Sequence, residues 1–137
     1  MATYGWGLDE SFKAATNLSA CQYHWVKAGS VAGEVAAATA GSVPLPLGVL
    51  QNDPNAGEEA VVRLFGISKL AASGALSSGA ASPIAHGDPV TVGSHGKGLH
   101  ASACVFQAIA LSALASAAGG TITVFVVPPG ARLGEEQ

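Results

Sequence analysis

Six residues of this chain could bind a transition metal: His24, His86, His95, His100, Cys21 and Cys104. A zinc or iron site needs three or four such ligands that converge. His95 and His100 flank a glycine-rich turn with no acidic residue beside either one, and Cys104 follows without a second cysteine nearby. We therefore expect loop and surface histidines, with no metal and no other cofactor.

The candidate acid–base residues are carboxylates that the pattern puts in turns, at strand starts or in the C-terminal tail: Asp9, Glu10, Asp53, Glu58, Glu59, Asp88, Glu135 and Glu136. Water solvates such positions, whereas a catalytic pair needs one buried acid. The chain has no G-x-S-x-G nucleophile elbow. It has no phosphate-binding G-x-x-x-x-G-K-[ST] loop either, because the glycines before Lys97 have the wrong spacing and no Ser or Thr follows that lysine. We expect no enzymatic activity.

Charged residues are scarce in this chain. They make up 11% of its 137 residues, and hydrophobic residues make up 49%, whereas an ordinary soluble domain has about 25% charged residues. The length suits one domain with its own core. The low charge suggests that much of the surface lies against other protein, and a weakly charged soluble monomer is the alternative that composition leaves open.

The charge pattern argues against nucleic acid, because the net charge is −3 and the basic residues form no stripe. The uncharged run 101–118 is mostly Ala and Ser with Gln107 in its middle, which is too weakly apolar for a membrane span. No secretory signal is expected at the N-terminus, so we expect synthesis in the cytoplasm. Cys21 and Cys104 are then expected as free thiols, with a disulfide between them as the alternative.

Short apolar runs separated by turn formers predict an all-β fold of short antiparallel strands. Gly48–Lys69 is expected to form a hairpin around a polar turn at 51–57. Residues 107–114 fit either strand or helix. Residues 47–64 and 109–126 share the order apolar run, turn ending in glycine, strand, which suits a barrel or sandwich with two similar halves; two unrelated hairpins are the alternative. Further strands are expected at 22–26, 31–39, 87–93, 99–105 and 121–127.

The N-terminal residues 1–18 carry Tyr4, Trp6 and Phe12 among glycines and polar residues, with no clear strand or helix period. One or two helical turns over 9–15 would fit, with Asp9 or Ser11 as N-cap. We expect an extended arm that docks on another protein through the three aromatic side chains. The alternative is a tail whose aromatics fold back onto their own core. A single β domain is expected over 19–130 and a mobile tail over 131–137.

The segment Gly48–Lys69 resembles a segment of the small capsid cement, or head decoration, proteins of tailed bacteriophages. Weaker similarities extend the resemblance over residues 12–127, for example at Gln22-Tyr23 and Gly87-Asp88, whereas residues 95–107 depart from the family pattern. The residues of the main segment that carry the resemblance are Gly48, Val49, Leu50, Gln51, Asn52, Pro54, Gly57, Glu58, Gly66, Ser68 and Lys69.

The resemblance implies a small β-barrel or β-tulip with an N-terminal arm, located on the outer surface of the virion head. It implies a trimer at three-fold and quasi-three-fold positions that stabilises contacts between major capsid protein subunits, and it implies no catalytic residues. The expected partners are the major capsid protein and other copies of this chain, with no nucleic acid and no membrane. The alternatives are a β-rich phage tail or fibre component and a small ligand-binding or enzymatic barrel.

Overall fold

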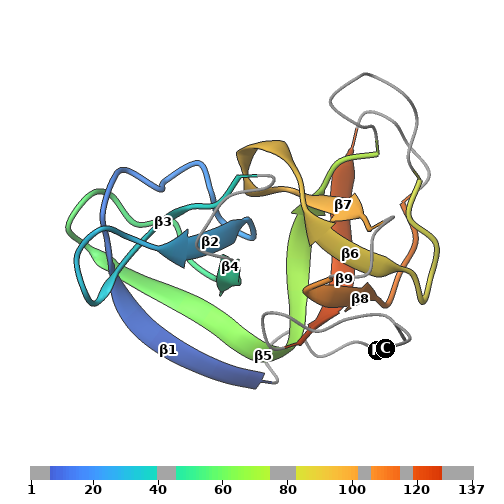
Figure 1. Ribbon diagram of the computed structural model, residues 1–137, viewed down its shortest axis with the longest axis horizontal. Coiled ribbons are helices and arrows are strands. Elements are labelled where there is room, and N and C mark those ends of the chain that lie inside the picture. The colour runs from blue at the N-terminus through green and yellow to red at the C-terminus, as the bar shows by residue number, and fades with distance from the viewer. Residues whose placement is uncertain (1–6, 40–45, 75–82, 102–105, 115–118, 128–137) are drawn as a thin grey trace, which may run out of the picture.

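The computed structural model describes residues 7–39, 46–74, 83–101, 106–114 and 119–127. Within these residues the chain forms nine β-strands and one turn of 3-10 helix, so the expected all-β fold is confirmed (Figure 1). The elements are β1 (Gly7–Ala14), β2 (Trp25–Ala28), β3 (Glu34–Ala37), β4 (Pro46–Leu50), β5 (Glu59–Ala72), β6 (Pro89–Val92), η1 (Ser94–Gly96), β7 (Gly98–His100), β8 (Ala108–Ala110) and β9 (Gly120–Val126).

Most strands form where the apolar runs predicted them. Gly48–Lys69 is the hairpin of β4 and β5, and the ambiguous segment 107–114 contributes the short strand β8. The strand expected over 22–26 begins only at Trp25, because Tyr23 lies in a turn with a φ of 64°. The expected strands at 31–39, 87–93 and 121–127 correspond to β3, β6 and β9. The expected strand at 99–105 overlaps β7, and its residues 102–105 lie outside the described residues.

Of the uncharged run 101–118, the structure describes residues 101 and 106–114, and this part belongs to the β structure. It contributes β8, and beyond it Leu114 forms an isolated antiparallel bridge with Ile84. In the part of the chain that the structure describes, no helix is long and apolar enough to cross a membrane.

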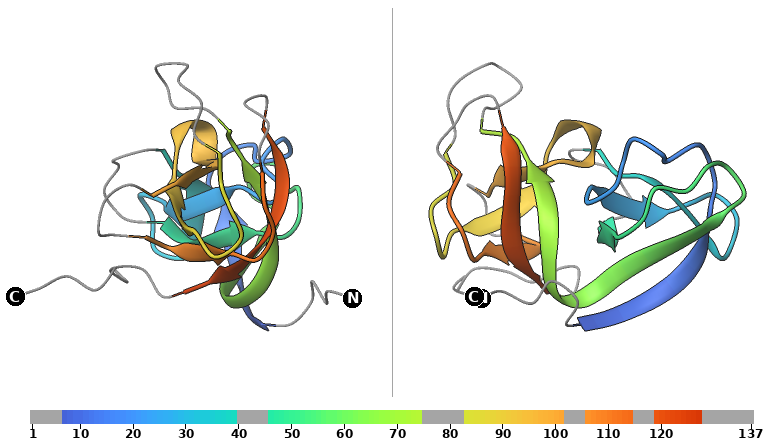
Figure 2. Two further views of the ribbon diagram at one scale, coloured as in Figure 1. Left: turned by 90° about the vertical axis from the view of Figure 1, so that its right-hand side faces the viewer. Right: turned by 180° about the vertical axis from the view of Figure 1, so that it is seen from behind.

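The strands close into two rings that share the long strand β5 (Figures 1 and 2). The first ring has the order β1-β3-β2-β4-β5 and closes because β1 also pairs with β5. The second has the order β5-β7-β6-β8-β9 and closes because β9 also pairs with β5. Ring closure pairs the edge strands of each sheet with one another, which removes sites where other chains could add.

The two rings have the same topology. In each one the first strand is parallel to the third, which gives the pairs β1–β3 and β5–β7, and the other neighbours are antiparallel. The hairpin β4–β5 takes the same place in the first ring as β8–β9 takes in the second. The sequence similarity between 47–64 and 109–126 therefore corresponds to equivalent hairpins in two rings of equal topology.

Strand β5 passes from one ring to the other at Gly66. Residues 59–66 pair with β1 and residues 66–72 pair with β9, so Gly66 is opposite both Gly7 and Val126. Its φ of 118° lies in a region that glycine enters freely and other residues rarely adopt. A glycine at this position lets one strand serve both rings.

A β-bulge precedes the crossing point. Leu8 on β1 is opposite Phe65 on β5, but the next residue, Asp9, is opposite Arg63. Leu64 is thus the additional residue of the bulge. Because the consecutive residues Leu8 and Asp9 point to opposite faces of the sheet, the bulge also turns Phe65 and Arg63 to opposite faces.

Two hydrophobic cores fill the rings, and the second draws on strands of both. It contains Leu70 and Ile122 from its own ring together with Trp25 and Val49 from β2 and β4. Strands β2 and β4 therefore alternate their side chains between the two cores, which couples the stability of one ring to that of the other. The buried residues of the first core are Ala14, Leu18, Val26, Val35, Leu50, Ala60 and Val62.

The folded domain begins earlier than the sequence predicted. Residues 7–14 form β1, which pairs with β5 and β3, so the expected arm over 1–18 is wrong for this part, as is the helical turn over 9–15. Leu18 is buried in the first core. Strand β1 escaped sequence reasoning because most of its residues are exposed and charged or polar, which hides the alternation of a half-buried strand. Tyr4, Trp6 and the tail 131–137 lie outside the described residues.

Candidate functional site

The glycines of the Gly48–Lys69 segment shape the hairpin itself. Gly48 lies so close to β5 that a Cβ atom in its place would overlap the carbonyl oxygen of Arg63. Gly57 has a φ of 85° at the end of the loop, and its N–H donates to the carbonyl of Ala14 at 2.8 Å. Both glycines are therefore needed by the backbone, which accounts for them without any ligand.

Two polar side chains of the same segment, one directly after β4 and one on β5, form a hydrogen bond with each other. The Gln51 amide donates to the Ser68 hydroxyl at 2.9 Å and to the carbonyl of Val49 at 3.1 Å. The Ser68 hydroxyl in turn donates to the carbonyl of Lys69 at 2.7 Å. These bonds satisfy the buried hydroxyl of Ser68.

The loop of the hairpin is held by its own polar groups. Asn52 donates to a β5 carbonyl at 2.9 Å and accepts from a β5 N–H at 3.0 Å. The Glu58 carboxylate accepts from a loop N–H at 2.8 Å. Pro54 is buried, and its carbonyl accepts from the N–H of Leu18 at 2.9 Å. Apart from Lys69, the polar residues that carry the family resemblance thus serve the local fold.

An ion pair joins β1 to β5 beside the crossing point. The Arg63 side chain is 5% exposed, and its Nε and Nη2 donate to the two carboxylate oxygens of Asp9, the second at 2.8 Å. Nη1 donates to the carbonyl of Ile67 at 2.6 Å. The expectation that Asp9 lies in a turn or caps a helix is wrong, because β1 carries it to a buried cation, where its side chain is still 34% exposed.

A hollow of about 320 Å³ opens beside β5 and β9, lined by Tyr23, Lys69, Thr121, Ile122 and Thr123. Lys69 is directly opposite Thr123, and Thr121 is opposite Ala71. The residues that alternate with them are buried, so these side chains point out of the second ring. The Lys69 ammonium lies over the Tyr23 ring, 5.6 Å from its centroid, which is a cation–π distance.

The backbone fixes Tyr23 in this hollow. Its φ of 64° lies in the left-handed region, which a bulky residue rarely adopts. Its N–H donates to the carbonyl of Leu50 at 2.7 Å, and its own carbonyl accepts from the N–H of Ala71 at 2.8 Å. Backbone strain that the surroundings maintain in this way clusters at functional sites.

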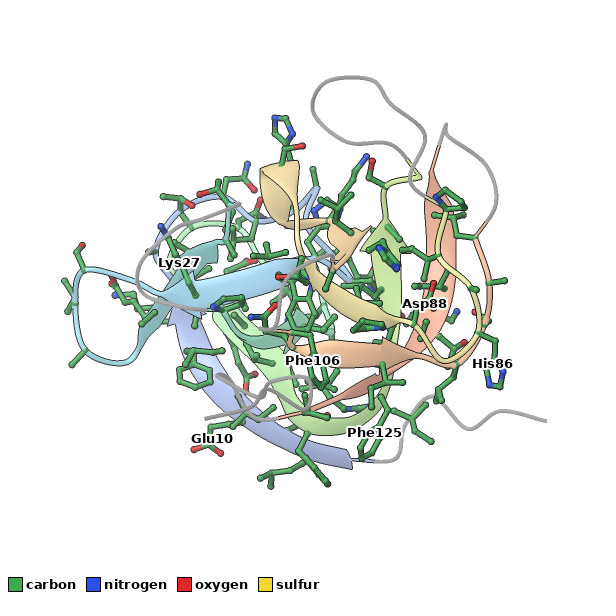
Figure 3. The ribbon with its side chains drawn as sticks, turned by 45° about the vertical axis from the view of Figure 1, so that its right-hand side comes forward. Glu10, Lys27, His86, Asp88, Phe106 and Phe125 are labelled. Carbon is green, nitrogen blue, oxygen red and sulfur yellow. The ribbon has the colours of Figure 1, made fainter. Side chains whose placement is uncertain are left out.

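A group of exposed and half-buried apolar side chains lies on β5, β9 and the neighbouring β1, closer to the crossing point. Leu8 is 61% exposed, and its cross-strand partner Phe65 is 38% exposed. The Phe65 ring meets Phe125 edge-on with centroids 5.2 Å apart, and Ile67 is opposite Phe125. Figure 3 shows Phe125 at the lower margin of the molecule. We call Leu8, Phe65, Ile67 and Phe125 the apolar face.

The histidines form no ligand cluster. Among the described residues, no three His, Cys, Asp or Glu side chains are grouped so that they could hold a metal ion. The fold does bring an acid to His100 that the sequence does not reveal, since its Nε2 lies 3.5 Å from Oδ2 of Asp88. His24 Nδ1 is 2.8 Å from the carbonyl oxygen of His95. The first contact joins β7 to the residue before β6, and the second joins the residue before β2 to η1.

Of the aromatic residues expected to contact a partner, Phe12 is half-buried and packs against the first core. Its role as a contact residue stays a prediction, as do those of Tyr4 and Trp6. Cys21 is a free thiol, and burial raises its pKa. The expected free thiol at Cys104 lies outside the described residues and stays a prediction.

Sequence reasoning identified Lys69 but missed its neighbours in the hollow. Thr121, Thr123 and Phe125 alternate with buried residues in β9, and that alternation is a signal that places all three on one outward face. The position of Tyr23 beside Lys69 depends on a turn and on long-range strand pairing, and the local sequence carries no signal for either.

Comparison with models of protein families finds no match, and comparison with curated proteins finds none either. Among solved structures, the fold is similar to the head fiber gp8.5 N base of bacteriophage phi29, with a TM-score of 0.62 and 16% sequence identity. The match covers 93% of this chain and 98% of that chain. At this identity the comparison establishes a shared fold over nearly the whole of both chains.

Proposed function

We propose that this chain is a structural virion protein that binds the outer surface of an assembled phage head and stabilises contacts between major capsid protein subunits. The observation that carries the proposal is the fold shared with a phage head fibre base over 93% of the chain. The resemblance of Gly48–Lys69 to cement proteins supports the same location by an independent route. In this proposal the protein has no catalytic role.

The mechanism is one of linkage. A protein that binds the assembled lattice and not its separate subunits stabilises the lattice, because dissociation of the shell must also release the bound protein. Such binding needs contact area on a rigid scaffold more than it needs a pocket. Two coupled rings with 11% charged residues provide that kind of surface. We further propose a homotrimer at three-fold positions, since small residues permit close contact between copies.

The base of a head fibre is the second candidate function, and the fold similarity to the head fiber gp8.5 N base of phi29 favours it. A fibre base also binds the head, but its task is to hold a distal structure. It would leave the stability of the shell unchanged, so the two candidates differ in one measurable property.

The experiment is to mix purified protein with expanded, undecorated heads, sediment them, and then record the thermal transition of the shells. The proposal predicts co-sedimentation at micromolar concentration and a higher transition temperature of the shell. Co-sedimentation with an unchanged transition would favour a fibre base. Absence of co-sedimentation would contradict both functions.

A further inference from the structure

We infer that the outward face of β5 and β9 is the surface that docks on the head, and that the hollow at Lys69 receives an Asp or Glu carboxylate of the capsid protein. This inference rests on the proposed function and adds the location and chemistry of the contact. It is drawn from the side chains that line this face.

The outward face of the two strands is continuous and carries one charge. Strand pairing puts Ile67 opposite Phe125 and Lys69 opposite Thr123. An apolar part therefore passes directly into the cationic hollow. Lys69 is the only charged residue among these outward positions, which are Phe65, Ile67, Lys69 and Ala71 on β5 and Thr121, Thr123 and Phe125 on β9.

The hollow has the donors that a carboxylate requires. Lys69 brings an ammonium group, and the Tyr23 ring beneath it restricts where that ammonium lies. Three other lining residues, Tyr23, Thr121 and Thr123, each carry a hydroxyl, and Ile122 is the remaining one. Within the described residues none of these three hydroxyls has a hydrogen-bond partner. A carboxylate accepts several hydrogen bonds at once, and bonds to a charged donor are the stronger ones.

The hollow is preorganised for this contact. Hydrogen bonds to Leu50 and Ala71 hold the strained backbone of Tyr23, and its side chain packs against the second core, so the phenol is in position before any partner arrives. Binding then does not have to order the ring, which lowers the entropic cost of association.

The apolar face explains why the ligand is a protein carboxylate and not a small anion. Leu8 and Phe65 are 61% and 38% exposed, and Phe65 and Phe125 form an aromatic pair. A cluster of large apolar and aromatic side chains beside a charged group is typical of protein–protein contact sites, which have an apolar core and a polar rim. A free anion would use the hollow alone and leave this face in water.

The first test compares head binding of Lys69→Glu with that of Lys27→Glu, by sedimentation at low salt. Lys27 lies on β2 of the first ring, well away from Phe125 (Figure 3), and its replacement makes the same change in net charge. Lys69→Glu should weaken binding about tenfold or more, because it sets like charges against each other at the contact. Lys27→Glu should bind like the unchanged protein. Equal binding of both variants would overturn the inference while the proposed function stands.

The apolar face is tested by Phe65→Ser with Phe125→Ser, against Val31→Ser as control. Val31 is 58% exposed in the loop between β2 and β3. The double variant should bind heads at least about tenfold more weakly, as expected for aromatic contact residues, and the control should bind normally. Circular dichroism and melting of the free proteins separate lost contact from lost folding. If the double variant and the Val31→Ser control have the same melting temperature and the same affinity for heads, the apolar face is not the docking surface.

Cross-linking identifies the partner group directly. A carbodiimide couples a lysine to a carboxylate only when the two are in contact. Treatment of decorated heads should join Lys69 to an Asp or Glu of the capsid protein, and mass spectrometry would locate the bond. Capsid cross-links from other lysines alone would refute the inference but leave the proposed function intact. Failure of the unchanged protein to bind heads would refute both.

Discussion

Arg63 on β5 and Asp9 on β1 are 54 positions apart, yet their side chains form a two-point ion pair beside the crossing between the rings. The bulge at Leu64 makes this possible, because it turns Arg63 toward the buried side of β5 and Phe65 toward solvent. The same bulge thus allows the ion pair that joins β1 to β5 and exposes the aromatic side chain of Phe65 on the apolar face.

Removal of the Asp9 carboxylate should destabilise the free protein. Asp9→Ala removes the carboxylate that accepts hydrogen bonds from Nε and Nη2 of the buried Arg63 guanidinium. We expect a loss of about 2–3 kcal/mol in the free energy of unfolding, below the value for a fully buried pair because water reaches Asp9. Urea unfolding measures this loss. Glu10→Ala, an exposed carboxylate on the same strand, is the control and should change stability by less than about 0.5 kcal/mol. Equal losses of unfolding free energy in the two variants would show that the ion pair contributes nothing to stability.

Replacement of Gly48 or Gly57 by alanine should destabilise the protein for two different reasons. Gly48→Ala forces a Cβ atom against a backbone carbonyl and should cost about 2–3 kcal/mol. Gly57→Ala meets nothing within 4 Å but must adopt a φ of 85°, which costs about 1–2 kcal/mol. Gly33→Ala has the same φ and the same open space outside the motif, so it should match Gly57→Ala. Chemical denaturation measures the free energy of unfolding of the three variants. If Gly57→Ala lost much more of it than Gly33→Ala, the loop at 51–57 would have a further role.

The sequence supported the fold class and the strongest strands because these depend on local patterns. The β-branched run of β9 and the turn formers after Leu50 specify a strand and a hairpin without help from distant residues. Strand β1 could not be predicted, because Asp9 is stabilised by Arg63 only after the chain has closed the first ring. The hollow depends in the same way on long-range pairing, which sets Lys69 beside Tyr23.

The two rings should unfold together, since Trp25 and Val49 of the first ring belong to the second core. Leu50→Ala in the first core and Leu70→Ala in the second should each cost about 2–5 kcal/mol. Each variant should keep a single transition that coincides by far-UV circular dichroism and tryptophan fluorescence. Leu111→Ala, at a position 39% exposed, should unfold almost like the unchanged protein. Two separated transitions in either core variant would show that the rings are independent.

Cys21 should react slowly with alkylating reagents near neutral pH. Burial raises its pKa above the ordinary value of 9.0, and the thiolate is the reactive form. The raised pKa also means that the thiol contributes stability below its unfolded pKa and that this contribution is lost as the pH rises through the folded pKa. Iodoacetamide labelling followed by peptide mapping should show Cys21 modified more slowly in the folded protein than in urea at pH 8. Equal rates would contradict the raised pKa.

We propose above all that this protein belongs to the outer surface of an assembled phage head. The most direct measurement is a reconstruction of head particles with and without the protein, at a resolution that separates small domains. The account predicts added density on the outside of the shell that fits two adjoining rings, grouped in threes at three-fold and quasi-three-fold positions, with the outward face of β5 and β9 against the capsid protein. Identical reconstructions of the two particles would contradict it.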